Sequence, residues 1–185
     1  MLRPNLIGVS GFARSGKDTA CKIFQTKLKE RLGIDLDIVS FAKQIKQDCD
    51  QLLTTNLSIS AFTEVPSEKE LIRPLLVEYA ELMKQKFGDT VWLDKAFQNG
   101  SRGIIPDVRF PIEADTIKKL GGIVVYIDKV GVLPANKLEE KNDKAMRDRA
   151  DHIIRWPHYG DLSMCEKDVD ECIDDICVYD FPMAR

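Results

Sequence analysis

The chain has 185 residues, of which 44% are hydrophobic and 31% are charged, a balance typical of one soluble globular domain. Its net charge of −3 provides no basic field of the kind that binds nucleic acid, and no apolar stretch reaches the length of a membrane span. We therefore expect a single domain over residues 1–185, with no nucleic-acid or membrane partner.

The five cysteines form no C-x-x-C pair, and no histidine lies at zinc-finger spacing from them. An odd number of cysteines and the lack of a signal peptide predict reduced thiols and a cytoplasmic location. His152 and His158 have no sequence partners that suggest a metal site or a nucleophile, so we interpret both as structural.

Near the N-terminus, residues 6–10 form a short apolar run that predicts a strand, and residues 11–17 (GFARSGK) fit the G-x-x-x-x-G-K phosphate-binding loop. A helical pattern follows directly, as this motif requires. Backbone N–H groups of such a loop converge on one anion, and Lys17 would reach the outer phosphates of a nucleoside triphosphate. The residues expected to bind this triphosphate and its metal are Ala13, Arg14, Ser15, Gly16, Lys17, Asp18 and Thr19.

The loop departs from the usual motif at Asp18, where a Mg²⁺-binding Ser or Thr is typical. Asp18 and Thr19 are the candidate ligands of a Mg²⁺ ion that bridges the donor phosphates. Because Asp18 adds negative charge to an anionic site, it must meet a cation, either the metal or a nearby Arg or Lys.

After the loop, helical and strand patterns alternate. Apolar spacing predicts a helix over Lys17–Leu32, a short strand at Ile38–Val39 and a helix over Ala42–Leu53. This alternation indicates an α/β fold with a mainly parallel sheet of about five strands.

In the middle of the chain, the sequence predicts a loop followed by helices. Residues 54–66 are polar and irregular, which predicts a loop at the mouth of the site. Residues 67–70 have the form of a capping box, so a helix is expected to begin there, and Pro74 to interrupt or restart it before residues 75–87. A short helical piece over residues 91–97 carries Trp92. Its spacing is compatible with either a core residue or a base-stacking platform.

Residues 103–108 predict a third strand, followed by a helix over residues 112–120. In doubly wound sheets, ligands sit outside the carboxyl ends of the strands. We therefore expect Asp107 and Arg109 to face the same crevice as Lys17.

These strand-end residues allow several roles. Arg109 could clamp an acceptor phosphate with two hydrogen bonds. Asp107 could orient Arg109, bind a metal water, accept a hydrogen bond from substrate, or cap the next helix. Glu113 either lies just behind them or is a solvated acid in the first helical turn.

The C-terminal third completes the pattern. Residues 123–127 predict a buried strand, residues 151–156 a last short strand, and an apolar stripe from Leu162 a closing helix. Residues 129–150 are strongly charged, which is typical of a solvated helix or of a mobile lid whose Arg147 or Arg149 closes on phosphates.

Two motifs carry a resemblance to a known family. Residues 10–19 (SGFARSGKDT) and residues 106–114 (PDVRFPIEA) resemble motifs of the bacteriophage deoxynucleoside monophosphate kinases, relatives of the P-loop nucleoside monophosphate kinases. Residues 73–76 (RPLL), followed by Trp92, are similar to the middle signature of that family. The resemblance spans most of residues 5–127.

The resemblance implies a P-loop kinase fold of three α/β/α layers, a monophosphate-binding helical region over residues 54–90 and a small helical lid over residues 129–150. It also implies an enzyme that transfers the γ-phosphate of ATP to a deoxynucleoside monophosphate with Mg²⁺, in the host cytoplasm if the protein is phage-encoded, and plausibly as a homodimer. Lys17, Asp18, Asp107 and Arg109 would then be catalytic. The residues that would surround the monophosphate are Arg73, Lys86, Trp92, Asp107, Arg109 and Glu113.

The sequence departs from the family where an arginine often precedes the tryptophan, since this chain has Lys84 and Lys86 there. Two other functions stay open. Phosphomevalonate-type kinases share the Gly-Lys-Asp form and act on a different phosphorylated acceptor, and a non-catalytic nucleotide-binding module would need only the loop. Arg109 after Asp107 favours a two-substrate kinase over a molecular switch.

Overall fold

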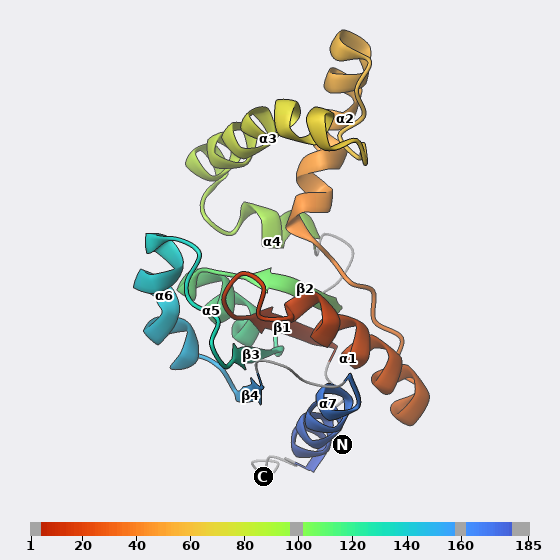
Figure 1. Ribbon diagram of the computed structural model, residues 1–185, viewed down its shortest axis with the longest axis vertical. Coiled ribbons are helices and arrows are strands. Elements are labelled where there is room, and N and C mark those ends of the chain that lie inside the picture. Colours follow the sequence, from red (N-terminus) through yellow and green to blue (C-terminus); the bar gives the residue numbers. More distant parts are fainter. Residues whose placement is uncertain (1–4, 97–101, 158–161, 179–185) are drawn as a thin grey trace. The chain divides into compact units, whose positions relative to one another are not determined.

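The computed structural model describes residues 5–96, 102–157 and 162–178. The chain forms two compact units, which we call the sheet unit (Met1–Val39 and Gly100–Arg185) and the helical unit (Ser40–Asn99). Figure 1 shows the strands in the sheet unit and three helices in the helical unit. The region 54–90 that the sequence singled out lies within the helical unit.

The sheet unit is built on four parallel strands: β1 (Leu6–Ser10), β2 (Gly103–Val108), β3 (Ile123–Lys129) and β4 (His152–Trp156). Their order is β2-β1-β3-β4, so β1 is central, and all five of its residues are buried. Burial on both faces explains why β1 and β3 read as continuous apolar runs.

The strand expected at Ile38–Val39 is reduced to a single parallel bridge between Ile38 and Ile104 of β2. Val39 N–H donates to the Ile104 carbonyl at 2.8 Å, and Ile104 N–H donates to the Asp37 carbonyl at 2.8 Å. Pairing stops there because helix α2 begins two residues later, at Phe41. With this bridge counted, the sheet has about five members, as predicted.

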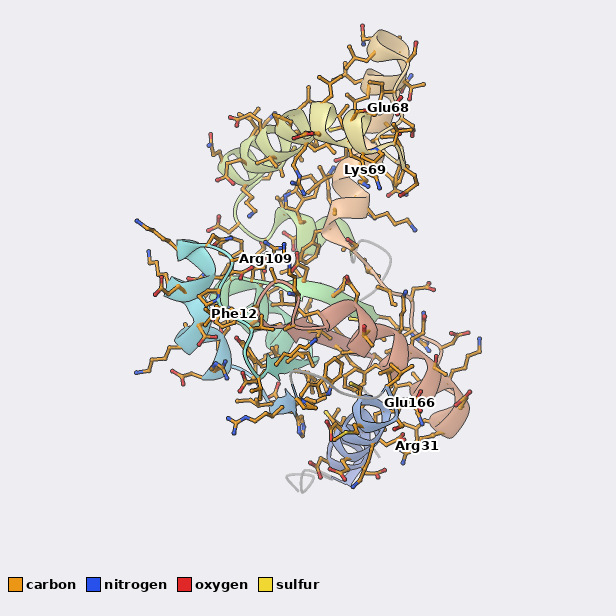
Figure 2. All side chains as sticks on the ribbon, in the orientation of Figure 1. Phe12, Arg31, Glu68, Lys69, Arg109 and Glu166 are labelled. Atoms are coloured by element: carbon orange, nitrogen blue, oxygen red, sulfur yellow. The ribbon has the colours of Figure 1, made fainter. Side chains whose placement is uncertain are left out.

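Helices cover both faces of the sheet and complete three layers (Figure 1). Helices α1 (Lys17–Leu32) and α7 (Leu162–Val178) pack against each other on one side of the sheet. A second pair within the sheet unit consists of α5 (Pro111–Lys119) and α6 (Lys137–Arg147), which also pack against each other. Arg31 of α1 pairs with Asp170 and Asp174 of α7. Figure 2 labels Arg31 and, on α7, Glu166.

The helical unit contains α2 (Phe41–Leu57), α3 (Pro66–Phe87) and α4 (Val91–Ala96). Helix α2 extends four residues beyond the predicted end, so the loop expected over residues 54–66 is shorter. Helix α3 begins at Pro66 with Val65 as its N-cap, and the predicted capping box does not start it. Proline is favoured at the first helical position because its missing N–H would be unpaired there anyway.

Pro74 was expected to interrupt or restart this helix, but α3 is continuous through it. A proline removes one backbone hydrogen bond and crowds the preceding turn. Packing outweighs this cost, because Ile72 lies in a small core with Cys49, Leu53 and Ala61.

None of the helices in the described part of the chain combines the length and apolar character needed to cross a membrane. Cys21, Cys49 and Cys172 are buried thiols that form no disulfide within the described part of the chain. Burial raises the pKa of the Cys21 and Cys172 thiols to about 12, so both are inert, neutral core residues.

Candidate active site

The phosphate-binding loop joins the end of β1 to the start of α1. The Ser15 N–H donates to the Phe12 carbonyl at 3.1 Å, which closes a tight turn. Gly16 has φ of 96°, and a Cβ there would lie 2.6 Å from Cζ3 of Trp156. A Cβ on Gly11 would lie 2.5 Å from the carbonyl oxygen of Ile127. Both glycines are therefore needed for close approach as well as for backbone conformation.

The remaining loop residues differ in exposure. Arg14 is exposed with a left-handed φ of 66°, a conformation that is uncommon outside glycine. Ser15 Oγ is buried and has no hydrogen-bond partner among the described residues. Asp18 is exposed in the first turn of α1, and Thr19 beside it is half-buried.

Lys17 lies across the loop at its center. Its ammonium donates to the carbonyl oxygens of Gly11 at 2.9 Å and of Phe12 at 2.8 Å. The side chain is 11% exposed, and this burial lowers its pKa, an effect that the nearby Asp107 carboxylate opposes. Lys17 is thus a buried ammonium held at the mouth of the loop.

Asp107 links Lys17 to Arg109, as the strand-end argument predicted. Its Oδ1 lies 4.0 Å from Lys17 Nζ, and its Oδ2 accepts a hydrogen bond from Arg109 Nε at 2.8 Å. This hydrogen bond raises the pKa of Arg109 and keeps the guanidinium charged. Asp107 Oδ1 is buried and accepts no hydrogen bond from any described residue. One carboxylate therefore lies between the two cations, hydrogen-bonded to Arg109 and within ion-pair distance of Lys17.

Glu113 binds the backbone of Arg109 and Phe110, directly after β2. It is only 6% exposed, and its Oε2 accepts hydrogen bonds from the N–H groups of Arg109 at 2.8 Å and Phe110 at 3.0 Å. Of the two sequence interpretations, a solvated acid is wrong, since Glu113 lies behind Asp107 and Arg109 and caps α5.

Helix α6 closes one side of the site. One stripe of this helix, Glu139, Asn142, Asp143 and Met146, faces the loop and the ends of β2 and β3 around a cavity of about 20 Å³. Figure 2 labels Phe12 and Arg109, which also line this cavity. Sequence reasoning missed Glu139 and Asn142, although their spacing with Met146 repeats every three to four residues, as one helix face does.

The two candidate lid arginines are paired with carboxylates. Arg147 binds Asp128 at 3.0 Å and Asp143 at 3.0 Å, and its guanidinium stacks over the Tyr126 ring at 4.4 Å. The hydrogen bond to Asp128 raises the pKa of Arg147. Arg149 binds Asp115 of α5 at 2.9 Å. Arg147 thus ties α6 to β3, and Arg149, two residues beyond the end of α6, ties this segment to α5.

The other predicted substrate residues belong to the helical unit. Arg73 and Lys86 are exposed on α3, and Lys86 Nζ lies 5.0 Å from the centroid of the Phe87 ring. Trp92 is 3% exposed, and its indole N–H donates to the Ala80 carbonyl at 3.3 Å. Trp92 is therefore a core residue of that unit. His152 lies 4.0 Å from Asp175, and His158 falls outside the described residues.

No model of a known protein family matches the chain, and no curated protein matches its sequence. A solved shikimate kinase from Acinetobacter baumannii in complex with shikimate is similar, with a TM-score of 0.52 and 13% identity over 96% of each chain. An APS kinase from Mycobacterium tuberculosis matches with a TM-score of 0.41 and 12% identity over 95% of this chain and 99% of its own. A thymidylate kinase from Ehrlichia chaffeensis matches with a TM-score of 0.41 and 14% identity over 94% and 99%.

At these identities the likeness shows the fold alone, and the fold assignment rests on the first match. That match covers 96% of this chain, whose parallel sheet, loop between β1 and α1 and three layers are described above. The chain has the α/β fold of the P-loop kinases.

Proposed function

We propose that this protein is a kinase that transfers the γ-phosphate of ATP to a deoxynucleoside monophosphate, giving a deoxynucleoside diphosphate and ADP. One observation carries the proposal: Asp107 lies 4.0 Å from Lys17 and 2.8 Å from Arg109. The two cations flank one carboxylate at the ends of neighbouring strands. A donor phosphate on Lys17 and an acceptor phosphate on Arg109 would therefore be neighbours.

Phosphoryl transfer depends mainly on positioning the two phosphates and on stabilising the charge of the transferred group. In this proposal the loop N–H groups and Lys17 hold the donor phosphates. Arg109 binds the acceptor phosphate, and Asp107 holds Arg109 at a fixed angle. Glu113 holds the backbone of Arg109 and Phe110 through one hydrogen bond from each N–H, so the clamp is set from both sides.

Mg²⁺ fits the donor set at the start of α1. Asp18 and Thr19 offer a carboxylate and a hydroxyl oxygen, and no group of three or more metal-ligating residues occurs in the part of the chain that is described. Kinases commonly hold this ion by one or two protein ligands together with substrate phosphates. We propose Asp18 and Thr19 as those ligands; the ion, when bound, would neutralise phosphate charge.

For the acceptor nucleoside we propose Arg73, Lys86 and Trp92 of the helical unit. The support is the family resemblance and, for Arg73 and Lys86, their exposed positions on α3. Trp92 would act by shaping the helical unit, since its ring is buried there. We propose residues 129–150 as the lid, with Arg147 and Arg149 as its anchors.

The test is a coupled ATP-consumption assay over all ribonucleoside and deoxyribonucleoside monophosphates, with phosphomevalonate and shikimate as further acceptors. We expect turnover with one or more deoxynucleoside monophosphates. Turnover with phosphomevalonate alone would favour the other phosphorylated acceptor. ATP binding without turnover on any acceptor would instead indicate a non-catalytic module.

The Arg109→Ala variant tests the clamp in the same assay. It should raise the KM for the monophosphate and lower kcat together, because the clamp acts in the ground state and the transition state. Arg102→Ala is the matched control, since Arg102 is exposed just before β2 and binds the Asp35 carbonyl instead. If the variant changes only the affinity for ATP, Arg109 belongs to the ATP site and not to the acceptor site.

We also propose a homodimer, in keeping with the family resemblance. Leu71, Leu75 and Leu82 are 65%, 41% and 54% exposed on α3, which provides apolar surface for a contact. Sedimentation equilibrium should give twice the 21.0 kDa of one chain. A species of 21.0 kDa at all concentrations would exclude the dimer.

A further inference from the structure

Helix α6 contacts the phosphate-binding loop through a carboxylate. Glu139 Oε2 accepts a hydrogen bond from the Ala13 N–H at 3.3 Å and another from the Ala135 N–H at 2.9 Å. We call this pair of hydrogen bonds the Glu139 contact. Ala13 belongs to the G-x-x-x-x-G-K loop, whose N–H groups are the expected ligands of phosphate oxygens.

The Glu139 contact is held in place from the rest of α6. One turn further along, Asn142 Nδ2 donates to the Arg109 carbonyl at 3.2 Å, and Asp143 accepts a hydrogen bond from the Tyr126 hydroxyl. Arg147 then joins Asp143 to Asp128 at the end of β3. The C-terminal half of α6 is thus tied to the sheet, and its first turn carries Glu139 to the loop.

The space beneath α6 is narrow. The cavity between α6, the loop and the ends of β2 and β3 measures about 20 Å³. A cavity of roughly this size holds a single water molecule. A phosphate oxygen that accepts the Ala13 N–H would therefore take the place of the Glu139 carboxylate and break the Glu139 contact.

Electrostatic repulsion also favours the displacement of Glu139 when a phosphate binds. The carboxylate of Glu139 and a phosphate are both anions, so each disfavours the other at the Ala13 N–H. Glu139 is also close enough to contribute to the charge balance of the two cations. Burial lowers the pKa of Lys17, against which Asp107 and, less strongly, Glu139 act. Of the carboxylates that act on this ammonium, Glu139 is the one that a phosphate at the Ala13 N–H would replace.

We propose that Glu139 is a gating residue that competes with the triphosphate of the nucleotide for the Ala13 N–H, so that phosphate binding displaces the first turn of α6. This inference rests on the proposed function only in taking the loop as the triphosphate site. It adds that α6 opens and closes at its first turn, with Asp143 and Arg147 as the fixed end. The acceptor plays no part in it.

The test measures binding without an acceptor. Isothermal titration calorimetry with inorganic tripolyphosphate, with ATP and with adenosine is carried out on the wild type and on Glu139→Gln. Glutamine keeps an acceptor oxygen of similar reach but removes the charge, and charge-assisted hydrogen bonds are about twice as strong as neutral ones. We expect tripolyphosphate and ATP to bind about tenfold more tightly, which corresponds to ~1.4 kcal/mol, and adenosine to bind unchanged.

Glu140→Gln is the matched control, because it removes the same charge from the next residue, whose side chain is exposed. Its affinity for tripolyphosphate should stay within twofold of the wild type. An unchanged or weaker affinity in Glu139→Gln would overturn the proposal, as a purely structural role predicts that result. Equal tightening in Glu140→Gln would also overturn it, since the effect would then be one of net charge.

Lys17→Met separates this inference from the proposed function. If Lys17→Met abolishes tripolyphosphate binding and Glu139→Gln changes nothing, only the gating role is wrong. If Lys17→Met binds tripolyphosphate as the wild type does, the loop is not the triphosphate site and both proposals are wrong. If the acceptor assay shows no turnover, the proposed kinase activity is wrong, but the binding measurement still tests the gating role of Glu139 by itself.

Discussion

The two hydrogen bonds that Glu113 accepts make the Glu113→Ala variant a quantitative test of the site. The carboxylate is 6% exposed and receives the N–H groups of Arg109 at 2.8 Å and Phe110 at 3.0 Å. A hydrogen bond to a charged group contributes about 1.5–3 kcal/mol. Because the freed N–H groups can regain water once the side chain is removed, we take the lower end for each. The free energy of unfolding should therefore fall by about 3 kcal/mol.

Urea denaturation followed by circular dichroism measures this loss, and Glu113→Gln should lose about half as much because its amide oxygen still accepts a hydrogen bond. The exposed Glu30 on α1 provides the control variant Glu30→Ala, which should change stability by less than ~0.5 kcal/mol. Should Glu113→Ala lose no more than this control, the two hydrogen bonds would not stabilise the segment, and the reasoning about the Arg109 clamp would fail with them.

Two further variants test the donor side. Lys17→Met should abolish phosphoryl transfer while the circular dichroism spectrum stays that of the wild type, because the hydrogen bonds of the ammonium to described residues go to the loop carbonyls of Gly11 and Phe12; wild-type turnover would refute the loop assignment. Asp18→Ser should shift the Mg²⁺ concentration needed for half-maximal activity without abolishing activity, and a Mg²⁺ titration identical to the wild type would show that Asp18 merely begins the helix.

Local patterns were sufficient for the phosphate-binding loop and its setting. The G-x-x-x-x-G-K spacing, the apolar run before it and the amphipathic pattern after it specify strand, turn and helix through short-range backbone preferences. The adjacency of Asp107, Arg109 and Lys17 also followed from the sequence. Carboxyl ends of parallel strands meet at one edge of a sheet, so two strand-end motifs had to meet once both strands were recognised.

Helix boundaries were less accessible because tertiary packing decides them. The predicted break at Pro74 did not occur, since the burial of Ile72 against Cys49 and Leu53 sustains α3 through the proline. Likewise, α2 continues to Leu57 although the sequence there is polar. Intrinsic preferences of below about 1 kcal/mol for an ordinary residue, and of about 3 kcal/mol for a proline, are outweighed here by such packing.

The sequence by itself determined the loop, the parallel sheet and the strand-end pair of Asp107 and Arg109, because each depends on neighbours along the chain or on a general rule of sheet topology. Only the tertiary structure decided which acids act on that site. Glu113 and Glu139 lie in charged helical segments, where the sequence does not distinguish exposed acids from inward-facing ones. A carboxylate is recognised as a cap or a gate only when the N–H groups that donate hydrogen bonds to it are in place.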